Sequence, residues 1–341
     1  MKKIASKTYL IPIFICLAIV AGAAYFYLFA SIAKDGKEHF IYIDKDDNAD
    51  SVFAKLDTMT TTSGMAAFSM LARHSGYGER IIPGRYAVKP GTGALQLLRN
   101  MRNGAQAPVR LTIPSVRTKE KLAAILGNKL QTDSLELAKT LADPAVCSRY
   151  GLDTMTIACL FIPNTYNVYW TISARELLDR MQKESRIFWN EDRRKKTKNL
   201  GLTEVQVITL ASIVDEETAN DAEKPMVAQM YLNRLRADMP LQADPTIKFA
   251  LKQFELKRIY HGHLSVNSPF NTYRNKGLPP GPIRIPTVAG IDAVLNHAVH
   301  EYLYMCAKED LSGTHNFAKT YEEHLQNAKK YSDALNKRGI K

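Results

Sequence analysis

A long uncharged segment near the N-terminus constrains this chain more than any other feature of its sequence. From residue 8 to residue 33 there is no charged side chain, and Ile, Leu, Phe, Ala and Val dominate the run. A bilayer core about 30 Å thick needs about 20 apolar residues in a helix, so the segment is long enough to cross a membrane. The apolar core of a cleavable signal peptide usually spans only about 7–15 residues. We therefore predict a retained transmembrane anchor over 8–33.

The charges on either side of this segment predict its orientation. Lys2, Lys3 and Lys7 precede it with no acidic residue among them, whereas basic and acidic residues balance between 34 and 38. Because positively charged flanks stay on the cytoplasmic side, we expect a cytoplasmic tail over 1–7 and export of everything after the anchor.

Three cysteines, Cys147, Cys159 and Cys306, would then lie in an oxidising compartment. An odd number leaves at least one thiol free, and the sequence leaves open whether any two of them pair. No CxxC spacing, P-loop or GxGxxG motif occurs in the chain. We therefore expect no zinc or redox site of that kind and no cofactor.

The basic balance of the chain raises the question of nucleic-acid binding, because Lys and Arg exceed Asp and Glu by 12. The run at 193–198 is strongly basic, but it has no interleaved aromatic residues and no nucleic-acid motif around it. We interpret this run as a solvated helix end. An exported basic chain would be attracted to anionic polymers and to a lipid surface, so we expect no nucleic-acid partner.

The exported portion divides into two regions, which fits a prior of about 150 residues per soluble domain. A small module over 40–106 has a βααβ pattern that a plain spacer domain would also show. Its strands are expected at 40–43 and 84–88, and its helices at 51–56, 63–74 and 94–103. A larger region over 107–341 starts with a strand at 109–113 and continues with helices at 118–131, 134–141 and 172–190. These patterns predict the α+β fold class.

The most informative helix begins at Thr203, which forms a capping-box pattern with Gln206. Apolar residues at 207, 210, 211 and 214 define one buried helix face, and Glu217 continues the same spacing. Glu216 falls on the more polar side. An ionised carboxylate on a buried face is costly unless it is paired, so Glu217 is the candidate functional acid.

Three effects would raise the pKa of Glu217: partial burial, the like charges of Asp215 and Glu216, and the negative end of the helix dipole. A carboxyl group that stays protonated near neutral pH suits general-acid catalysis, such as protonation of a glycosidic oxygen. From the helix alone, a structural acid paired to Arg234 or Arg236 of the next helix is an equal alternative.

Three later segments, at 241–246, 268–273 and 277–283, place small polar side chains between prolines and rings. Such loops suit sugar hydroxyls and amides better than phosphates, because they offer many donors and acceptors but no glycine-rich anion cradle. The chemistry expected of Glu217 and the composition of these loops therefore agree.

Four stretches occurring in order resemble the endolytic murein transglycosylases, the YceG-like family: LTEVQVITLASIVDEET, MYLNRLRADMPLQADPT, SPFNTYRNKGLPPGPI and EYLYMCA with GTHNFAKTYEEH. The resemblance extends from the anchor to nearly the end of the chain. It implies a single-pass protein of the bacterial inner (cell) membrane that cleaves nascent peptidoglycan strands within the glycan chain, ends their elongation, and works beside the peptidoglycan polymerases (penicillin-binding proteins). It also implies a LysM-like module over 40–106 and a YceG-like catalytic domain over 107–341 with a lysozyme-like helical cleft.

The catalytic glutamate of that family is the second acid of an ASIxExET-type motif, so the resemblance assigns this role to Glu217. The sequence departs from the family pattern at four positions. Asp215 stands where Glu is usual, Asn164 where Asp is usual, Phe270 where Tyr is common and Ala243 where Thr is frequent. These departures concern substrate contacts and leave the acid in place.

The implied reaction breaks the β-1,4 bond between N-acetylmuramic acid and N-acetylglucosamine and leaves a 1,6-anhydro end. Hydrolases usually need two carboxylates, whereas a transglycosylase can use one residue first as acid and then as base. Asp244 is the competing second carboxylate, and we favour an orienting role for it. The residues expected to position the sugar are Asn233, Gln242, Asp244, Asn271, Thr272 and Tyr273.

Two other functions stay open. A membrane-tethered peptidoglycan-binding protein would retain glycan without changing its length. A metal-dependent hydrolase would need the His261-Gly262-His263 motif, but HxH is a weak signal and no acid has ligand spacing beside it. We therefore expect no metal. The histidines considered as further ligands are His297, His300, His315 and His324, the last two of which we interpret as local hydrogen-bonding or surface groups.

Overall fold

The computed structural model describes residues 5–256 and 258–338, which divide into two compact units. Unit 1 comprises the described residues of Met1–Arg110 together with Lys129–Gln131 and Asn167–Ile172. Unit 2 comprises Leu111–Asn128, Thr132–Tyr166 and the described residues of Ser173–Lys341. Three short segments of the region 107–341, at 107–110, 129–131 and 167–172, therefore belong to unit 1.

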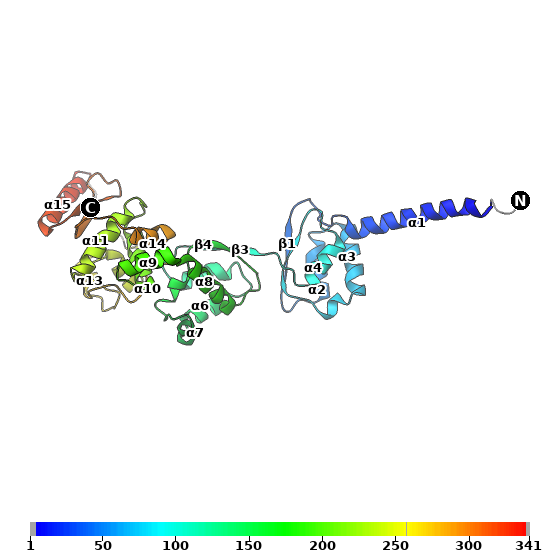
Figure 1. The fold of residues 1–341 in the computed structure, drawn as a ribbon, viewed down its shortest axis with the longest axis horizontal. Coiled ribbons are helices and arrows are strands. Elements are labelled where there is room, and N and C mark those ends of the chain that lie inside the picture. The colour runs from blue at the N-terminus through cyan, green and yellow to red at the C-terminus, as the bar shows by residue number, and fades with distance from the viewer. Residues whose placement is uncertain (1–4, 257, 339–341) are drawn as a thin grey trace. The chain divides into compact units, whose positions relative to one another are not determined.

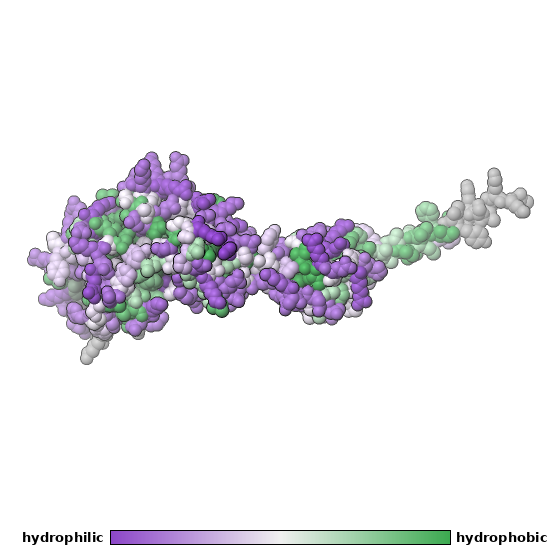
Figure 2. Space-filling model, turned by 90° about the horizontal axis from the view of Figure 1, so that it is seen from below, coloured by the Kyte–Doolittle hydropathy of each residue, from purple (hydrophilic) through white to green (hydrophobic). Residues whose placement is uncertain are grey.

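Unit 1 begins with α1 (Ala5–Phe29), which ends four residues before the end of the anchor predicted over 8–33 (Figure 1). Ile32 and Ala33 are buried in the core of the small module, so the C-terminal bound of that prediction was too late. The 19 residues of Ile11–Phe29 are long and apolar enough to span a bilayer, and none of this stretch is buried. In the space-filling view the apolar side chains of this helix stand uncovered (Figure 2). Pro12 lies inside the helix, as membrane helices tolerate. By length and composition α1 can cross a membrane.

The remainder of unit 1 packs three helices against a two-stranded sheet, as predicted for 40–106. β1 (His39–Ile43) runs antiparallel to β2 (Gly84–Val88), with His39 opposite Val88. Their inward side chains, including Ile41 and Tyr86, are fully buried. All predicted bounds are confirmed to within two residues. The other elements are α2 (Ala49–Asp57), α3 (Thr62–His74), the 3-10 helix η1 (Tyr77–Glu79) and α4 (Ala94–Arg102).

The first half of unit 2 is mostly helical and includes the larger part of the strand pair β3 (Val109–Ile113) and β4 (Asn164–Val168). The helix predicted over 118–131 was too long, because α5 (Lys119–Gly127) ends where the chain turns into the next helix. A Cβ atom on Gly127 would lie 2.5 Å from the backbone nitrogen of Ser134, so only glycine allows this close approach. The elements that follow are α6 (Ser134–Ala142), α7 (Pro144–Arg149), η2 (Ile157–Leu160) and α8 (Ala174–Phe188).

The second half of unit 2 surrounds one central helix, α10 (Glu204–Glu217), which contacts α11 and α14 (Figure 1). The basic run at 193–198 lies in α9 (Glu191–Asn199) and extends through its last turn, and its basic side chains are exposed or half-buried, as expected of a solvated helix end. Together with the strands, these helices confirm the α+β class. The remaining elements are α11 (Lys224–Arg236), α12 (Asp244–Leu251), α13 (His261–Leu264), α14 (Val288–Leu295), the antiparallel pair β5 (Tyr304–Ala307) and β6 (His315–Ala318), and α15 (Tyr321–Lys337).

Helix α10 begins at the capping box that the sequence predicts. The hydroxyl of Thr203 accepts from the backbone N–H of Gln206, and the Gln206 side chain accepts from the backbone N–H of Thr203. Every residue from 207 to 215 is buried, so the helix is enclosed on all sides and not only on the face predicted from the spacing. A helix packed all round holds the residues at its C-terminal end in one position.

Candidate active site

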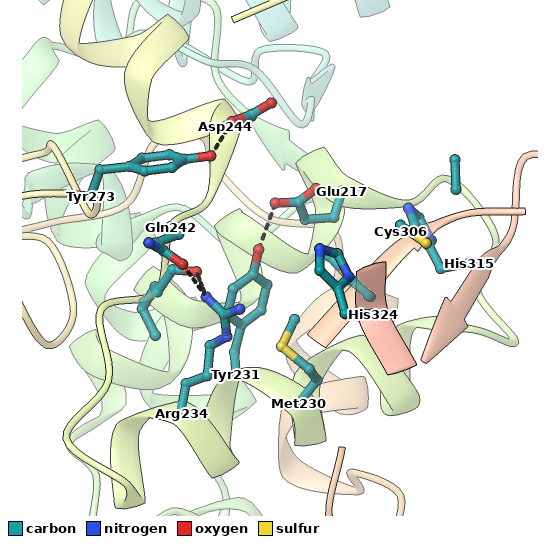
Figure 3. A pocket seen from close by; sticks show the side chains of 13 residues that line it. Glu217, Met230, Tyr231, Arg234, Gln242, Asp244, Tyr273, Cys306, His315 and His324 are labelled. Carbon is teal, nitrogen blue, oxygen red and sulfur yellow. Dashed lines mark hydrogen bonds between the residues drawn. The ribbon is translucent and has the colours of Figure 1, made fainter. Parts of the chain in front are cut away.

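A pocket of about 390 Å³ opens at the C-terminal end of α10 (Figure 3). Its walls come from α10, α11, the start of α12, the loop carrying Tyr273, and the C-terminal segment formed by β5, β6 and α15. Glu217 lies within it, between residues of α11 and α12 on one side and the C-terminal segment on the other. The lining residues are Glu217, Met230, Tyr231, Arg234, Leu241, Gln242, Asp244, Tyr273, Met305, Cys306, Ala307, His315 and His324.

Glu217 is the last residue of α10, and its side chain is held by a tyrosine. The hydroxyl of Tyr231 in α11 donates to Glu217 Oε1 over 2.6 Å (Figure 3). Tyr231 is only 2% exposed, and burial raises the pKa of its hydroxyl well above the ordinary value. Tyr231 therefore stays protonated and acts as a permanent donor to the carboxyl group.

Burial raises the pKa of Glu217 from an ordinary 4.5 to about 7. The hydrogen bond from Tyr231 opposes this rise, because it favours the charged form. The carboxylate of Asp244 raises the pKa further, Lys248 lowers it, and Glu216 adds a smaller rise. Near neutral pH both protonation states of Glu217 are therefore populated, as a residue needs if it is to give up a proton and later take one back.

Removing the Tyr231 hydroxyl should raise the pKa of Glu217 above 7. Tyr231→Phe keeps the ring but deletes the donor that stabilises the carboxylate, so the proton should be held more tightly. Carbon-13 NMR titration of the Glu217 carboxyl group would measure this. Tyr150→Phe is the matched control, because its hydroxyl donates to Asp179. An unchanged titration in Tyr231→Phe would mean that the bond does not stabilise the charged form.

The two acids that precede Glu217 do not enter the pocket. Asp215 pairs with the buried Lys224 over 2.8 Å and accepts from the backbone N–H and hydroxyl of Thr287. A Cβ atom on Gly290 would lie 2.5 Å from Asp215 Oδ1, so α14 packs directly on this carboxylate. Of the carboxylates that raise the pKa of Glu217, Asp244 from α12 has a larger effect than the adjacent Glu216.

Glu216 was expected on the polar side of the helix, but its side chain is only 8% exposed. Arg117 binds both of its oxygens, with nitrogen–oxygen distances of 2.8 and 2.9 Å, and Arg284 reaches one of them at 3.0 Å. These two arginines pair with the Glu216 carboxylate and fix the last turn of α10.

Glu217 is not paired to an arginine, so the alternative of a structural acid held by Arg234 or Arg236 is wrong. Arg234 lines the pocket, but its guanidinium donates to the carbonyls of Leu303, Pro240 and Leu241 and to the Gln242 side chain. Among residues 5–256 and 258–338 no cation forms an ion pair with Glu217. The acid is held by a neutral donor instead.

Three of the six residues predicted to position a sugar lie at this pocket. The hydroxyl of Tyr273 donates to Asp244 Oδ1 over 2.5 Å, beside Glu217 (Figure 3). Gln242 is the third of these residues that lines the pocket. Its backbone φ is 51°, in the left-handed region, where a residue other than glycine is strained. Strain of this kind often accompanies functional sites, because the surrounding structure holds the residue in place for another reason.

The other three predicted residues hold the walls together and do not line the pocket. The Asn233 amide donates to the carbonyls of His300 and Tyr302, which ties the C-terminal segment to α11. Asn271 is fully buried, and its amide donates to the carbonyls of Leu264 and Val266. The Thr272 hydroxyl accepts from the backbone N–H of Ala243 and shares a hydrogen bond with the hydroxyl of Thr246, at the start of α12.

The histidine motif of the metal hypothesis lies elsewhere in unit 2. His261 and His263 are on the short helix α13 and outside the pocket. In the described part of the chain no group of three His, Cys, Asp or Glu residues could hold a metal ion. Cys147 and Cys159 are buried free thiols, and Cys306 is a half-buried free thiol at the pocket.

A profile of the YceG-like family matches residues 41–330. The chain belongs to the YceG-like family. An endolytic murein transglycosylase of Bacillus subtilis is 36% identical over 133 residues, 39% of this chain and 36% of the relative. One of Streptococcus pneumoniae strain R6 is 27% identical over 368 aligned positions, 94% of this chain and 64% of the relative. The chain thus spans less than two thirds of the length of either relative.

The fold of this YceG-like chain has a counterpart among solved structures. The crystal structure of a putative YceG-like protein from Listeria monocytogenes matches with a TM-score of 0.55 and 26% identity, over 85% of this chain and 98% of that one. The family resemblance drawn from the sequence is confirmed.

Sequence reasoning missed the C-terminal wall of the YceG-like pocket. His315 and His324 were interpreted as local or surface groups, yet both line it together with Cys306. His315 bonds to Glu223 at the start of α11, and its backbone N–H donates to the same carboxylate. The stretch GTHNFAKTYEEH contains both histidines and carries part of the family resemblance, but nothing in its pattern indicates that it lies near Glu217.

Proposed function

We propose that this protein is an endolytic murein transglycosylase that cleaves the β-1,4 bond between N-acetylmuramic acid and N-acetylglucosamine within nascent glycan strands. The family membership and the names of the relatives support a peptidoglycan substrate. The observation that carries the proposal is Glu217, a carboxyl group in a pocket with a pKa of about 7, a neutral hydrogen-bond donor and no cation paired to it among the described residues.

In the proposed reaction Glu217 acts twice. It first donates its proton to the glycosidic oxygen as the bond to muramyl C1 breaks, so the N-acetylglucosamine side leaves with a hydroxyl. The muramyl C6 hydroxyl then bonds to C1 while the Glu217 carboxylate takes the proton of that hydroxyl. A 1,6-anhydro end forms, no water is consumed, and the acid is ready for another cycle.

Asp244, Gln242 and Tyr273 would contact the sugars directly, since they share the pocket with Glu217. Asn233, Asn271 and Thr272 would act through the walls they hold. Asp244 is hydrogen-bonded to Tyr273, which supports an orienting role over a nucleophilic one.

The anchor, the small module and the polymerases complete the proposal. A retained α1 would keep the chain in the inner membrane with residues 1–7 in the cytoplasm and the pocket outside it. There the enzyme would meet strands as penicillin-binding proteins make them and would end their elongation. The LysM-like character of 40–106 and the lysozyme-like form of the cleft remain predictions.

The ends of the reaction products test the proposal. Full-length protein in lipid nanodiscs should release fragments ending in 1,6-anhydro-muramic acid from uncrosslinked strands, as read by mass spectrometry. Reducing ends would mean that water attacks, and Asp244 would then be the second carboxylate of a hydrolase. Retention of strands with unchanged length, also in the presence of a polymerase, would instead favour the tethered peptidoglycan-binding protein.

A further inference from the structure

A second cavity in unit 2, of about 430 Å³, lies outside the site described above. Its lining is mainly apolar, unlike that of the pocket around Glu217. The rings of Phe249 and Phe270 pack at a centroid distance of 4.8 Å on one side. Met155 and Ala158 face them from the segment around η2, and Met155 is 47% exposed. We refer to this site as the phenylalanine cavity.

Positive charge surrounds the mouth of the phenylalanine cavity. The ammonium group of the exposed Lys252 has no hydrogen-bond or ion-pair partner within the described residues, and that of Lys119 donates to the carbonyl of Thr154. Nε and Nη2 of Arg117 donate to the two carboxylate oxygens of Glu216, so the charge of Arg117 is already paired. Glu120 is the one acid on this lining. The mouth therefore favours an anionic ligand with apolar parts.

The phenylalanine cavity and the pocket of Glu217 share two structural elements. Helix α12 contributes Asp244 to the pocket and Phe249 to the cavity, and these residues are separated by a rise of about 7.5 Å along the helix axis and by about 140° around it. Arg117 of the cavity holds Glu216, the neighbour of Glu217. A ligand bound at the acid would therefore reach the cavity by passing around α12.

We propose that the phenylalanine cavity binds the peptide arm that the muramyl residue of a glycan strand carries. This inference rests on the proposed function. A peptide arm combines small methyl side chains with free carboxylates, which matches an apolar floor beneath a lysine-bearing mouth. An extended peptide covers about 3.3–3.6 Å per residue, and a helix with its side chains is about 10–12 Å wide, so an arm of about four residues spans that width.

Two variants test the cavity without touching the residues around Glu217. Lys252→Glu reverses the charge at the mouth, and Ala158→Phe fills the floor. Lys195→Glu is the matched control, because it reverses an exposed lysine of α9 that is absent from the cavity lining. Each variant is prepared as the full chain in lipid nanodiscs, and its thermal unfolding is compared with that of the wild type. Should Ala158→Phe not fold, the surface substitution Lys252→Glu still gives the answer.

The first readout is binding of the free stem peptide, measured by calorimetric titration. The peptide should bind the wild type and Lys195→Glu alike, and at least about tenfold more weakly to the two cavity variants, a difference of about 1.4 kcal/mol. The second readout is cleavage of strands with and without their peptides. The cavity variants should raise KM about tenfold for peptide-bearing strands and should leave cleavage of peptide-free strands unchanged.

The two readouts separate this inference from the proposed function. Peptide binding that the cavity variants weaken, without strand cleavage by the wild type, would uphold the cavity and reject the transglycosylase. Equal cleavage of strands with and without peptides, together with no binding of the free peptide, would reject the role of the cavity and would still be consistent with the proposed transglycosylase. Binding of a fatty acid in place of the peptide would assign the cavity to an acyl chain and overturn the inference.

Discussion

Replacing Glu217 with glutamine should lower the rate of strand cleavage by a factor of about 10²–10⁴, the usual contribution of a positioned general acid. Glutamine keeps the size of the side chain and can still accept from Tyr231, but it has no proton to give to the glycosidic oxygen. KM should change little, because the residues expected to contact the sugar remain. Steady-state kinetics on uncrosslinked strands would measure both quantities.

Glu204→Gln is the matched control for this variant. Glu204 begins the same helix and pairs with Arg194 at the surface, outside the pocket, so its loss should leave cleavage unchanged. Activity of Glu217→Gln within a few-fold of the wild type would remove Glu217 from the mechanism and would turn attention to Asp244.

The stability of the Glu217→Gln variant provides a second check. The pKa of Glu217 is about 7 in the folded chain, above its ordinary value of 4.5. The folded state therefore binds this proton more tightly than the unfolded state, and stability falls as the pH rises from about 4.5 to 7. Above that window Glu217→Gln should be at least as stable as the wild type. An inactive and unstable variant would point to a structural acid instead.

Replacing Asp215 with alanine should cost about 3–5 kcal/mol of unfolding free energy, because it leaves a buried cation without its buried partner. The side chains of Asp215 and Lys224 are 2% and 5% exposed, and their charged atoms lie 2.8 Å apart. The same carboxylate accepts from the backbone of Thr287 at the start of α14. Denaturant unfolding would measure the loss. Cleavage should fall as well, since Glu217 follows two residues later on α10.

Asp221→Ala is the control for Asp215→Ala, because it removes the exposed ion pair of Lys224 and keeps the buried one. Asp221 also contacts Lys224, at 2.6 Å, but its side chain is 69% exposed, so its removal should cost at most about 1 kcal/mol. The double variant Asp215→Leu with Lys224→Met should recover much of the stability, because it removes both buried charges. A loss below about 1 kcal/mol in Asp215→Ala would mean that Asp221 alone satisfies the lysine.

The helices and strands of the small module could be predicted because their signals are local. The strand patterns at 40–43 and 84–88 and the caps of the following helices lie within a few residues of the elements they define. The helix over 118–131 was overestimated, since its end depends on the close packing of Gly127 against Ser134. Periodicity carries no information on such a contact.

Among the candidate site residues, spacing alone separated Glu217 from its neighbours, because helical geometry relates residues three and four apart. The same geometry did not reveal that Glu216 is buried, since α10 is enclosed by packing on several sides. The loop residues near Glu217 were chosen by composition. Composition cannot distinguish Tyr273, at the pocket, from its neighbours Asn271 and Thr272, which hold the loop.

The sequence by itself determined the apolar segment suited to a membrane, the start of α10 at Thr203 and the place of Glu217 at its end, because each depends on residues close together in the chain. Only the tertiary structure decided what surrounds that acid. Tyr231 lies 14 positions away, and the bond between Glu223 and His315 that supports the C-terminal wall spans 92 positions. Such partners are selected by the packing of whole helices, and no local pattern records them.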